Sequence, residues 1–175
     1  MTRWNPLCRA VPMVAGLLAA ALTSIAAVPA ARAEILQLSA TAFVARGVTS
    51  SVDDEGAGML QNATGQYYAT VPFPVAGMTV CSFSLVYRDF DSNHNITARL
   101  LRKNLNLGGT AFNPPVVMAQ AASTGFSDNM RRAWDTTITN PLISPGAAFY
   151  YVDLDIPFSA LQVVGVQITY KASCP

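Results

Sequence analysis

Met78-Thr79-Val80-Cys81-Ser82-Phe83-Ser84-Leu85-Val86-Tyr87-Arg88-Asp89 has an apolar side chain at every second position from Cys81 to Tyr87, with Ser82, Ser84 and Arg88 on the other side. On an extended backbone, neighbouring side chains point to opposite sides, so this period of two gives one apolar and one polar face. The pattern is typical of an antiparallel strand that has one face in a core and the other in water. The side chains that we expect in the core are Cys81, Phe83, Leu85 and Tyr87.

The same alternation recurs along the chain between clusters of Gly, Pro, Asn and Asp, and almost no segment has the apolar spacing of a helix. Together with residues 78–89, we expect strands over residues 40–46, 58–62, 67–71, 95–103, 115–122, 130–137, 149–156 and 161–170. Short strands at this spacing predict an all-β fold, a two-layer antiparallel β-sandwich, because a single sheet leaves both of its faces uncovered. A jelly-roll-like topology is the first choice. An immunoglobulin-like sandwich is the alternative, and it would bury Trp134 near a disulfide.

Residues 1–33 have the order of a cleavable secretory signal peptide. Arg3 and Arg9 precede an apolar run over residues 11–28, and Ala31-Arg32-Ala33 supplies the small residues of a cleavage site. Because Ala, Gly, Thr and Ser make up much of the run, a signal peptide is favoured over a transmembrane anchor. We therefore predict export, to the periplasm or out of the cell, of one β-sandwich domain over residues 34–175 that has no membrane span.

The charge of the predicted mature chain excludes one class of partner. Three of the 11 basic residues, Arg3, Arg9 and Arg32, lie in the predicted leader, so 8 basic residues face 10 acidic ones and the net charge is −2. Such a chain lacks the basic excess that attracts nucleic acids or anionic membranes. We therefore expect no nucleic acid partner.

Two cysteines, Cys81 and Cys174, remain after the predicted cleavage, and disulfides persist in exported proteins. We predict that they pair and close a loop of 174 − 81 = 93 residues. The bond would make the strand that begins near Cys81 and the last strand antiparallel neighbours, with Tyr170 near Leu85. The alternative is a pair of unbonded, buried thiols.

Segments of this chain resemble a group of uncharacterised secreted bacterial β-sandwich proteins of jelly-roll-like fold. The resemblance covers about residues 40–171 and lies in core-strand patterns, so it implies the fold and export, and it implies no chemistry. The segments that carry it are Val71-Pro72-Phe73-Pro74, Phe83-Ser84-Leu85-Val86-Tyr87-Arg88-Asp89, Ile96-Thr97-Ala98-Arg99-Leu100-Leu101-Arg102 and Gly165-Val166-Gln167-Ile168-Thr169-Tyr170.

One loop has the spacing of a calcium ligand set. Asp89, Asp91 and Asn93 place side-chain oxygens at positions one, three and five, as calcium loops do. Against calcium, His94 stands where an EF-hand needs Gly, and Leu100 stands where it needs a bidentate Glu. Since Asp and Asn are also ordinary turn residues, a plain hairpin turn is favoured over the calcium site.

Catalytic and zinc chemistry find little support in the sequence. His94, the one histidine, lies in a polar loop, where a solvated side chain is favoured over the base of a catalytic triad. A structural zinc site needs four Cys or His ligands. The predicted disulfide uses both remaining cysteines, so too few ligands are left for zinc. Asp153 and Asp155 share one face of a strand, which we interpret as its wet face and not as the acid pair of a glycosidase.

Aromatic side chains offer a second kind of candidate, since exposed rings on a β-sandwich can stack on sugars. Adjacent Tyr67-Tyr68 and Tyr150-Tyr151 must turn one ring of each pair to either side of a strand. Burial in the core or in a subunit contact is favoured over a glycan platform. The residues considered are Tyr67, Tyr68, Trp134, Phe149 and Tyr151, with Tyr67, Trp134 and Tyr151 as the ligand-stacking candidates.

These patterns predict a non-catalytic secreted or periplasmic β-sandwich that acts through its surface, by binding a ligand or partner or by self-association. The first alternative is a carbohydrate-binding or calcium-assisted binding module, and the second is a hydrolase. A hydrolase would need a deep pocket in which titratable groups converge. The partners left open are a glycan, a protein or a second copy of the chain, and calcium is the one cofactor considered.

Overall fold

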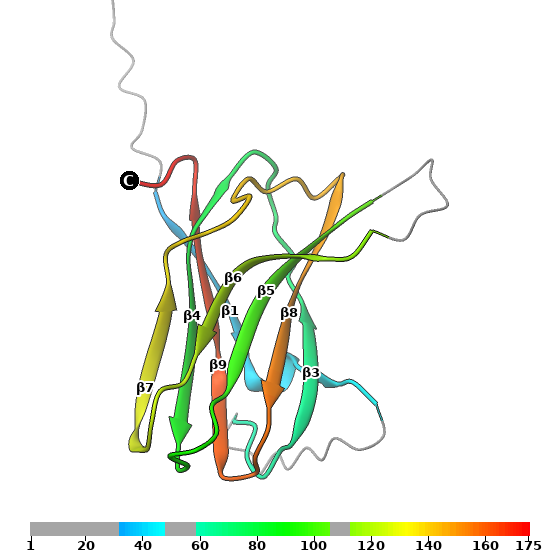
Figure 1. The fold of residues 1–175 in the computed structure, drawn as a ribbon. Coiled ribbons are helices and arrows are strands. Elements are labelled where there is room, and N and C mark those ends of the chain that lie inside the picture. The colour runs from blue at the N-terminus through cyan, green and yellow to red at the C-terminus, as the bar shows by residue number, and fades with distance from the viewer. Residues whose placement is uncertain (1–31, 48–58, 106–112) are drawn as a thin grey trace, which may run out of the picture.

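Two antiparallel sheets pack face to face, as the alternation predicts (Figure 1). The structure, a computed structural model, describes residues 32–47, 59–105 and 113–175, and these form nine strands and one short 3-10 helix. The predicted signal peptide lies outside the described residues except for Arg32 and Ala33. The elements are β1 (Glu34–Ser39), η1 (Ala40–Ala42), β2 (Val44–Ala45), β3 (Gly65–Thr70), β4 (Thr79–Asp89), β5 (Thr97–Asn104), β6 (Val116–Ala122), β7 (Ser127–Asp135), β8 (Ala148–Ile156) and β9 (Leu161–Lys171).

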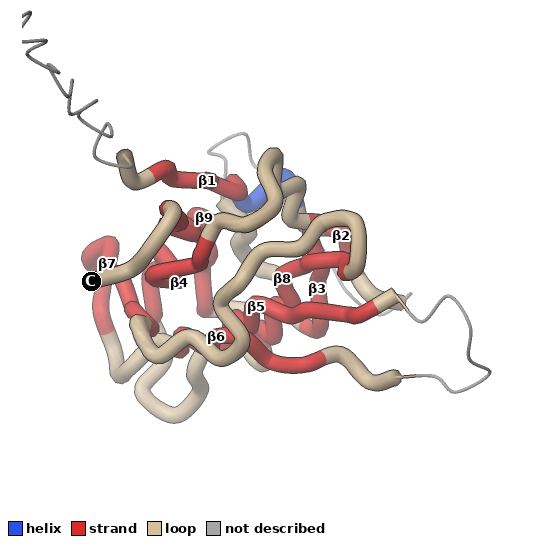
Figure 2. The backbone as a smooth tube through the Cα atoms, turned by 90° about the horizontal axis from the view of Figure 1, so that it is seen from above, coloured by secondary structure: helices blue, strands red, loops and turns tan. Residues whose placement is uncertain are grey.

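The strand order is β1-β9-β4-β7 in a four-stranded sheet and β2-β3-β8-β5-β6 in a five-stranded sheet. Seen from above, the strands of each sheet lie side by side and the two sheets form separate layers (Figure 2). The predicted all-β, jelly-roll-like sandwich is therefore confirmed. No helix in the described ranges is long and apolar enough to cross a membrane.

The core lies between the two sheets, where every second residue of each strand turns inward. In β8 and β9 the side chains alternate between buried and partly exposed along almost the whole strand. Phe83 and Leu85 of β4 and Leu154 of β8 are fully buried and belong to one core cluster. Trp134 is 56% exposed, so the buried tryptophan of the immunoglobulin-like alternative is absent from this core.

Several strand predictions before residue 78 need correction. Residues 34–39, which we left unassigned, form β1 and pair with β9. Residues 40–46, predicted as a strand, instead form η1 and the two-residue β2. In the described part of residues 58–62, the ladder is reduced to the isolated bridge of Leu60 with Val163. These segments lie at sheet edges, where few cross-strand neighbours enforce regular alternation.

The disulfide joins β4 to the segment that follows β9, and β4 and β9 are the two central strands of the four-stranded sheet. Cys81 and Cys174 are bonded, with their Cα atoms 5.3 Å apart, so the predicted pairing and the antiparallel pairing of β4 with β9 are confirmed. The finer prediction was wrong, because Tyr170 pairs with Val80 and Leu85 pairs with Val166. The expected register assumed that β9 runs straight on to Cys174, whereas β9 ends at Lys171 and the chain bends before the cysteine.

A register shift in β4 at Cys81 moves this residue out of the core. Val80 is 1% exposed and Phe83 is fully buried, whereas Cys81 between them is only partly buried. The predicted inward position of Cys81 was therefore wrong. The bond lies at the margin of the sheet and connects β4 to the exposed tail after β9.

Strand β1 reaches the edge of the four-stranded sheet through a close approach at Gly165. A Cβ atom at this position would overlap the carbonyl oxygen of Leu38 and would lie 3.3 Å from the Cα atom of Ser39. The hydroxyl of Tyr170 donates a hydrogen bond to Oε2 of Glu34 at 2.8 Å and fixes the other end of β1. Glycine at position 165 therefore permits β1 to pair with β9.

We predict that removing the disulfide lowers the free energy of unfolding. Closing a loop of 93 residues restricts the unfolded chain by roughly 4–5 kcal/mol, before any native strain is subtracted. Cys81→Ser, Cys174→Ser and the double variant should lose the same amount in urea unfolding, and reductant should lower only the wild-type protein to that level. Unchanged stability of the wild-type protein in reductant would contradict the prediction.

We predict that Gly165→Ala destabilises the protein by about 1–3 kcal/mol, because β1 must shift away from the added methyl group. Gly146→Ala is the matched control, since a Cβ atom there meets no atom within 4 Å. Thermal unfolding of both variants measures the effect, and hydrogen exchange of the β1 amides locates it. Equal melting temperatures of the two variants would show that the close approach costs nothing.

Candidate functional site

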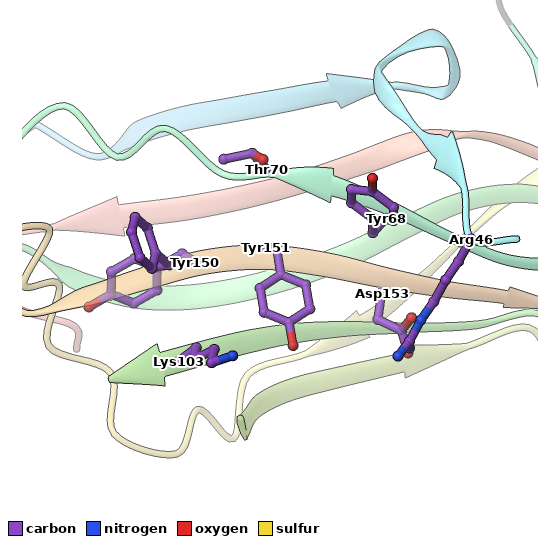
Figure 3. Close-up of a pocket in the computed structure, with 8 residues that line it drawn as sticks. Arg46, Tyr68, Thr70, Lys103, Tyr150, Tyr151 and Asp153 are labelled. Atoms are coloured by element: carbon purple, nitrogen blue, oxygen red, sulfur yellow. The ribbon is translucent and has the colours of Figure 1, made fainter. Parts of the chain in front are cut away.

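A groove of about 400 Å³ lies on the outer face of the five-stranded sheet, the face turned away from the core (Figure 3). Side chains from β3, β5 and β8 form it, together with the residue that follows β2. The lining residues are Arg46, Tyr68, Thr70, Lys103, Phe149, Tyr150, Tyr151 and Asp153.

The register of the sheet sets these side chains in rows. Asp153 of β8 lies between Tyr68 of β3 and Arg99 of β5. Two residues before Asp153 on β8, Tyr151 lies between Thr70 and Leu101. Two residues before Tyr151, Phe149 lies opposite Lys103. Because residues two apart on a strand share a face, the rings of Phe149 and Tyr151 both point outward.

Tyr150, between these two rings, anchors the strand to the core. Its ring is 3% exposed and packs edge-on against Phe73, with ring centroids 5.1 Å apart. Its hydroxyl accepts a hydrogen bond from the backbone N–H of Ser144 at 2.8 Å. Because Tyr150 points into the core, its two neighbours on the strand, Phe149 and Tyr151, both face the groove.

Exposed rings and polar groups occur together in the groove. Tyr68 is 43% exposed and Phe149 is 60% exposed, while Tyr151 is partly buried. Figure 3 shows the Tyr151 ring between Lys103 and Asp153. Aromatic faces beside hydrogen-bonding groups are the usual composition of a small-ligand site.

Charged groups surround the Asp153 carboxylate. Nη1 of Arg99 lies 3.5 Å from Oδ2 of Asp153, and Nε of Arg99 donates to Oε1 of Gln120 at 3.0 Å. From the opposite side, Arg46 extends toward Asp153 (Figure 3). The backbone N–H of Arg46 donates to the carbonyl of Gln66 at 2.7 Å. This hydrogen bond fixes the backbone position from which the Arg46 side chain extends.

The Tyr151 hydroxyl stays protonated at neutral pH. Burial raises the pKa of Tyr151, the nearby Asp153 carboxylate raises it further, and Arg46 opposes the shift. The hydroxyl can therefore both donate and accept a hydrogen bond at the edge of the groove.

A second groove of about 400 Å³ lies on the outer face of the four-stranded sheet, beside Gly165. Its described lining contains neither an aromatic ring nor a charged side chain. The lining residues are Gln37, Leu38, Ser39, Val86, Val164, Gly165, Val166 and Gln167. The groove of the five-stranded sheet is therefore the better candidate for specific recognition.

The sequence matches no protein-family model and none of the curated proteins. Among solved structures, the chain is similar to the CBM36-1 domain of a multidomain xylanase from the hindgut metagenome of Trinervitermes trinervoides. That likeness has a TM-score of 0.44 and 11% identity over 79% of this chain and 96% of that one.

Two further solved structures are similar. The CBM22-1-GH10 modules of an endo-1,4-beta-D-xylanase from Clostridium thermocellum, complexed with xylohexaose, have a TM-score of 0.45 and 15% identity over 78% of this chain and 27% of that one. The low affinity xylan binding module CBM86 from Roseburia intestinalis has a TM-score of 0.37 and 13% identity over 80% and 96%. At these values the likenesses carry no argument about function, which must come from the groove itself.

The structure separates the three ligand-stacking candidates. Tyr151 lines the groove. Tyr67 is fully buried and its hydroxyl donates to the carbonyl of Thr64 at 3.2 Å, so Tyr67 as a stacking residue was wrong. Its neighbour Tyr68 faces the groove instead, because the two side chains point to opposite sides of β3.

Trp134 is exposed but belongs to the other sheet. It lies on β7, and the guanidinium carbon of Arg132 is 4.9 Å from the centre of its ring. In register it pairs with Ser84 of β4, so it lies on the outer face of the four-stranded sheet. The structure therefore does not bring Trp134 together with Tyr151.

The groove also contains residues that sequence reasoning missed. Arg46 and Lys103 come from separate segments and line one groove only because β2 pairs with β3, and β3 and β5 both pair with β8. Asp153, interpreted as part of a wet face, lines the groove as well. The alternation indicated an outward Asp153, but nothing in the sequence indicated its neighbours across the sheet.

The loop after β4 uses its acidic side chains to cap its own backbone. Oδ1 of Asp89 accepts the N–H of Asp91 at 3.0 Å, and Oδ1 of Asp91 accepts the N–H groups of Asn93 and His94. Within the described residues, no group of three or more His, Cys, Asp or Glu side chains is arranged to hold a metal ion. These bonds are those of turns built on Asp side chains. Calcium binding at Asp89, Asp91 and Asn93 stays a prediction.

His94 lies in the same loop with its side chain 46% exposed. Its ring stacks on Phe158, with centroids 5.1 Å apart, and its Nδ1 is 3.2 Å from Oδ1 of Asp91. The expected solvated loop position agrees with this exposure.

We predict that Asp91→Ala lowers the melting temperature at neutral pH by the same amount in calcium and in chelator, because the lost bonds are to the backbone. Those backbone hydrogen bonds, the one from Asn93 first, lower the pKa of Asp91 below its ordinary 3.8. Because the pKa of Asp91 is lower in the folded than in the unfolded protein, its ionised carboxylate stabilises the fold at pH values above the unfolded pKa. The difference in melting temperature between wild type and variant should therefore vanish as the pH falls through the folded pKa. A wild-type melting temperature that rises with millimolar calcium, and an Asp91→Ala variant that does not respond, would favour the calcium site.

Proposed function

We propose that this chain is an exported, non-catalytic β-sandwich that binds a glycan in the groove of the five-stranded sheet. The observation that carries the proposal is the set of outward rings, Tyr68, Tyr151 and Phe149, beside charged and hydroxyl groups in one groove. A sugar ring has apolar C–H faces and a polar hydroxyl edge, so it requires this combination of surfaces.

The polar groups of the groove fit the hydroxyl edge of a sugar. Thr70 supplies a hydroxyl, Tyr151 supplies a phenol that both donates and accepts, and Asp153 supplies a carboxylate. Arg99 already holds the Asp153 carboxylate, which therefore needs little further ordering when a ligand arrives. Pre-ordered binding groups raise affinity because less entropy is lost on binding.

The shape of the groove favours a chain of sugars over a single one. From Asp153 to Phe149 the site extends over five residues of β8, which are four steps of about 3.3 Å, or about 13 Å. This length exceeds one sugar ring. We therefore expect the ligand to lie along β8, with affinity that rises as the oligosaccharide lengthens.

Export is part of the proposal because of the disulfide and the leader pattern. The Cys81–Cys174 bond requires an oxidising compartment, such as the periplasm or the cell exterior. Residues 1–33 have the pattern of the signal that would deliver the chain there.

Self-association is the second candidate, favoured by the surface of β7. This strand ends the four-stranded sheet, and Met130 and Trp134 on it are 53% and 56% exposed. An unpaired edge with exposed apolar side chains can pair with the same strand of a second copy. Light scattering after size-exclusion chromatography distinguishes a dimer from a monomer, and Trp134→Ala should dissolve a dimer of this kind.

We predict that Tyr151→Ala and Tyr68→Ala each weaken glycan binding about tenfold or more, because each removes an aromatic surface from the site. Glycan arrays identify a ligand for the wild-type protein, and calorimetric titration then measures the affinity of each variant. Trp134→Ala is the matched control, since it removes an exposed aromatic ring from the other sheet.

Unchanged melting temperatures of the variants would exclude a folding defect as the cause. Binding that is lost in Trp134→Ala and retained in Tyr151→Ala would move the site to the four-stranded sheet. A protein that binds no glycan on the arrays would contradict the proposed function.

A further inference from the structure

Cations outnumber carboxylates among the described side chains that line the groove. The predicted mature chain has a net charge of −2. Of the described side chains that line the groove, Arg46 and Lys103 are cations, and Asp153 is the single carboxylate. Among these described side chains, positive charge therefore exceeds negative charge, on a chain that is negative as a whole.

Asp153 offsets only part of this positive charge, because Arg99 also contacts it. The Arg99 guanidinium is 3.5 Å from the carboxylate, whose side chain is 14% exposed, and Arg46 extends toward the same carboxylate from the other side (Figure 3). Among these three side chains, the two guanidinium groups of Arg46 and Arg99 against the one carboxylate of Asp153 give 2 − 1 = +1. The nearest further acid on this face of β8 is Asp155, which pairs with Gln66 and Thr97 beyond the described lining of the groove.

The cations lie toward opposite ends of the site, with an aromatic ring between them. Arg46 lies at the Asp153 end, Lys103 pairs with Phe149 at the other end, and Tyr151 lies in the middle (Figure 3). Arg46 is exposed at the surface, so a ligand can reach its planar guanidinium. Guanidinium groups bind carboxylates and sulfates through paired, charge-assisted hydrogen bonds.

Building on the proposed function, we propose that the glycan is anionic. One acidic group of the glycan binds the Arg46 guanidinium, and its sugar ring packs on Tyr151. The next sugar of the glycan lies beside Lys103. A neutral glycan would fill the same aromatic surface but would form no bond between opposite charges with the exposed Arg46 guanidinium. Specificity for acidic chains then comes from charge, and affinity for sugar comes from the rings.

The test uses polyuronates with a matched neutral form. Polygalacturonate, alginate and hyaluronan are each titrated into the full mature protein beside the same polymer after carboxyl reduction, which removes the charge and keeps the linkages. At low salt, at least one acidic polymer should bind about tenfold tighter than its reduced form, and the difference should shrink with added salt because the groove is open to solvent.

Arg46→Gln locates the effect. This variant should bind acidic and reduced polymers alike, while Arg131→Gln, at an exposed arginine of β7, should keep the wild-type preference. Dextran sulfate beside dextran identifies the source of the charge. A preference for dextran sulfate that depends on Arg46 supports recognition of sulfate, and a preference confined to polyuronates supports recognition of carboxylate.

The outcomes separate the two proposals. Equal affinity for acidic and reduced polymers would overturn the anionic specificity and leave glycan binding intact. An acidic preference that persists in Arg46→Gln would overturn the role of Arg46. Absence of binding to every polymer, acidic or neutral, would overturn both.

Discussion

β4 and β9 pair along their full lengths, from Thr79 opposite Lys171 to Asp89 opposite Leu161. Each of the two strands has a further neighbour, β7 beside β4 and β1 beside β9, so the pair forms the centre of the four-stranded sheet. Their inward side chains, among them Phe83, Leu85 and Ile168, are fully buried. The disulfide limits the separation of the two strands in the unfolded chain, which favours the contact between distant segments at the centre of the four-stranded sheet.

Sequence alternation predicted the strands that are buried on one face along their whole length, such as β8 and β9. In such strands every second side chain must be apolar, because it lies in the core. It failed where the backbone departs from regular pleating. The register shift at Cys81 moved that residue out of the core, and a three-residue 3-10 helix interrupts residues 40–46. Adjacent Tyr67-Tyr68 required one outward ring, but alternation cannot indicate which one without the register of β3.

The site was harder to predict than the fold because it belongs to neighbours across the sheet. Tyr151 was a candidate on its own strand, yet Tyr68 and Lys103 reach it from β3 and β5, two strands that flank β8 and are far apart in the sequence. Pairing partners of this kind depend on the order of strands, and alternating patterns specify only faces. The positive charge of the groove was hidden for the same reason, since composition gives the charge of the chain and not its distribution.

The core and the groove are linked through one short segment, Phe149-Tyr150-Tyr151. Tyr150 packs against Phe73, which in turn packs edge-on against Tyr170 of β9, with ring centroids 5.1 and 5.6 Å apart. These contacts join the two sheets and fix the phase of β8, and the pleat then directs the rings on either side of Tyr150 outward. Evolution can therefore change the exposed side chains of this sheet, and with them the ligand, while the inward residues that hold the sandwich stay the same.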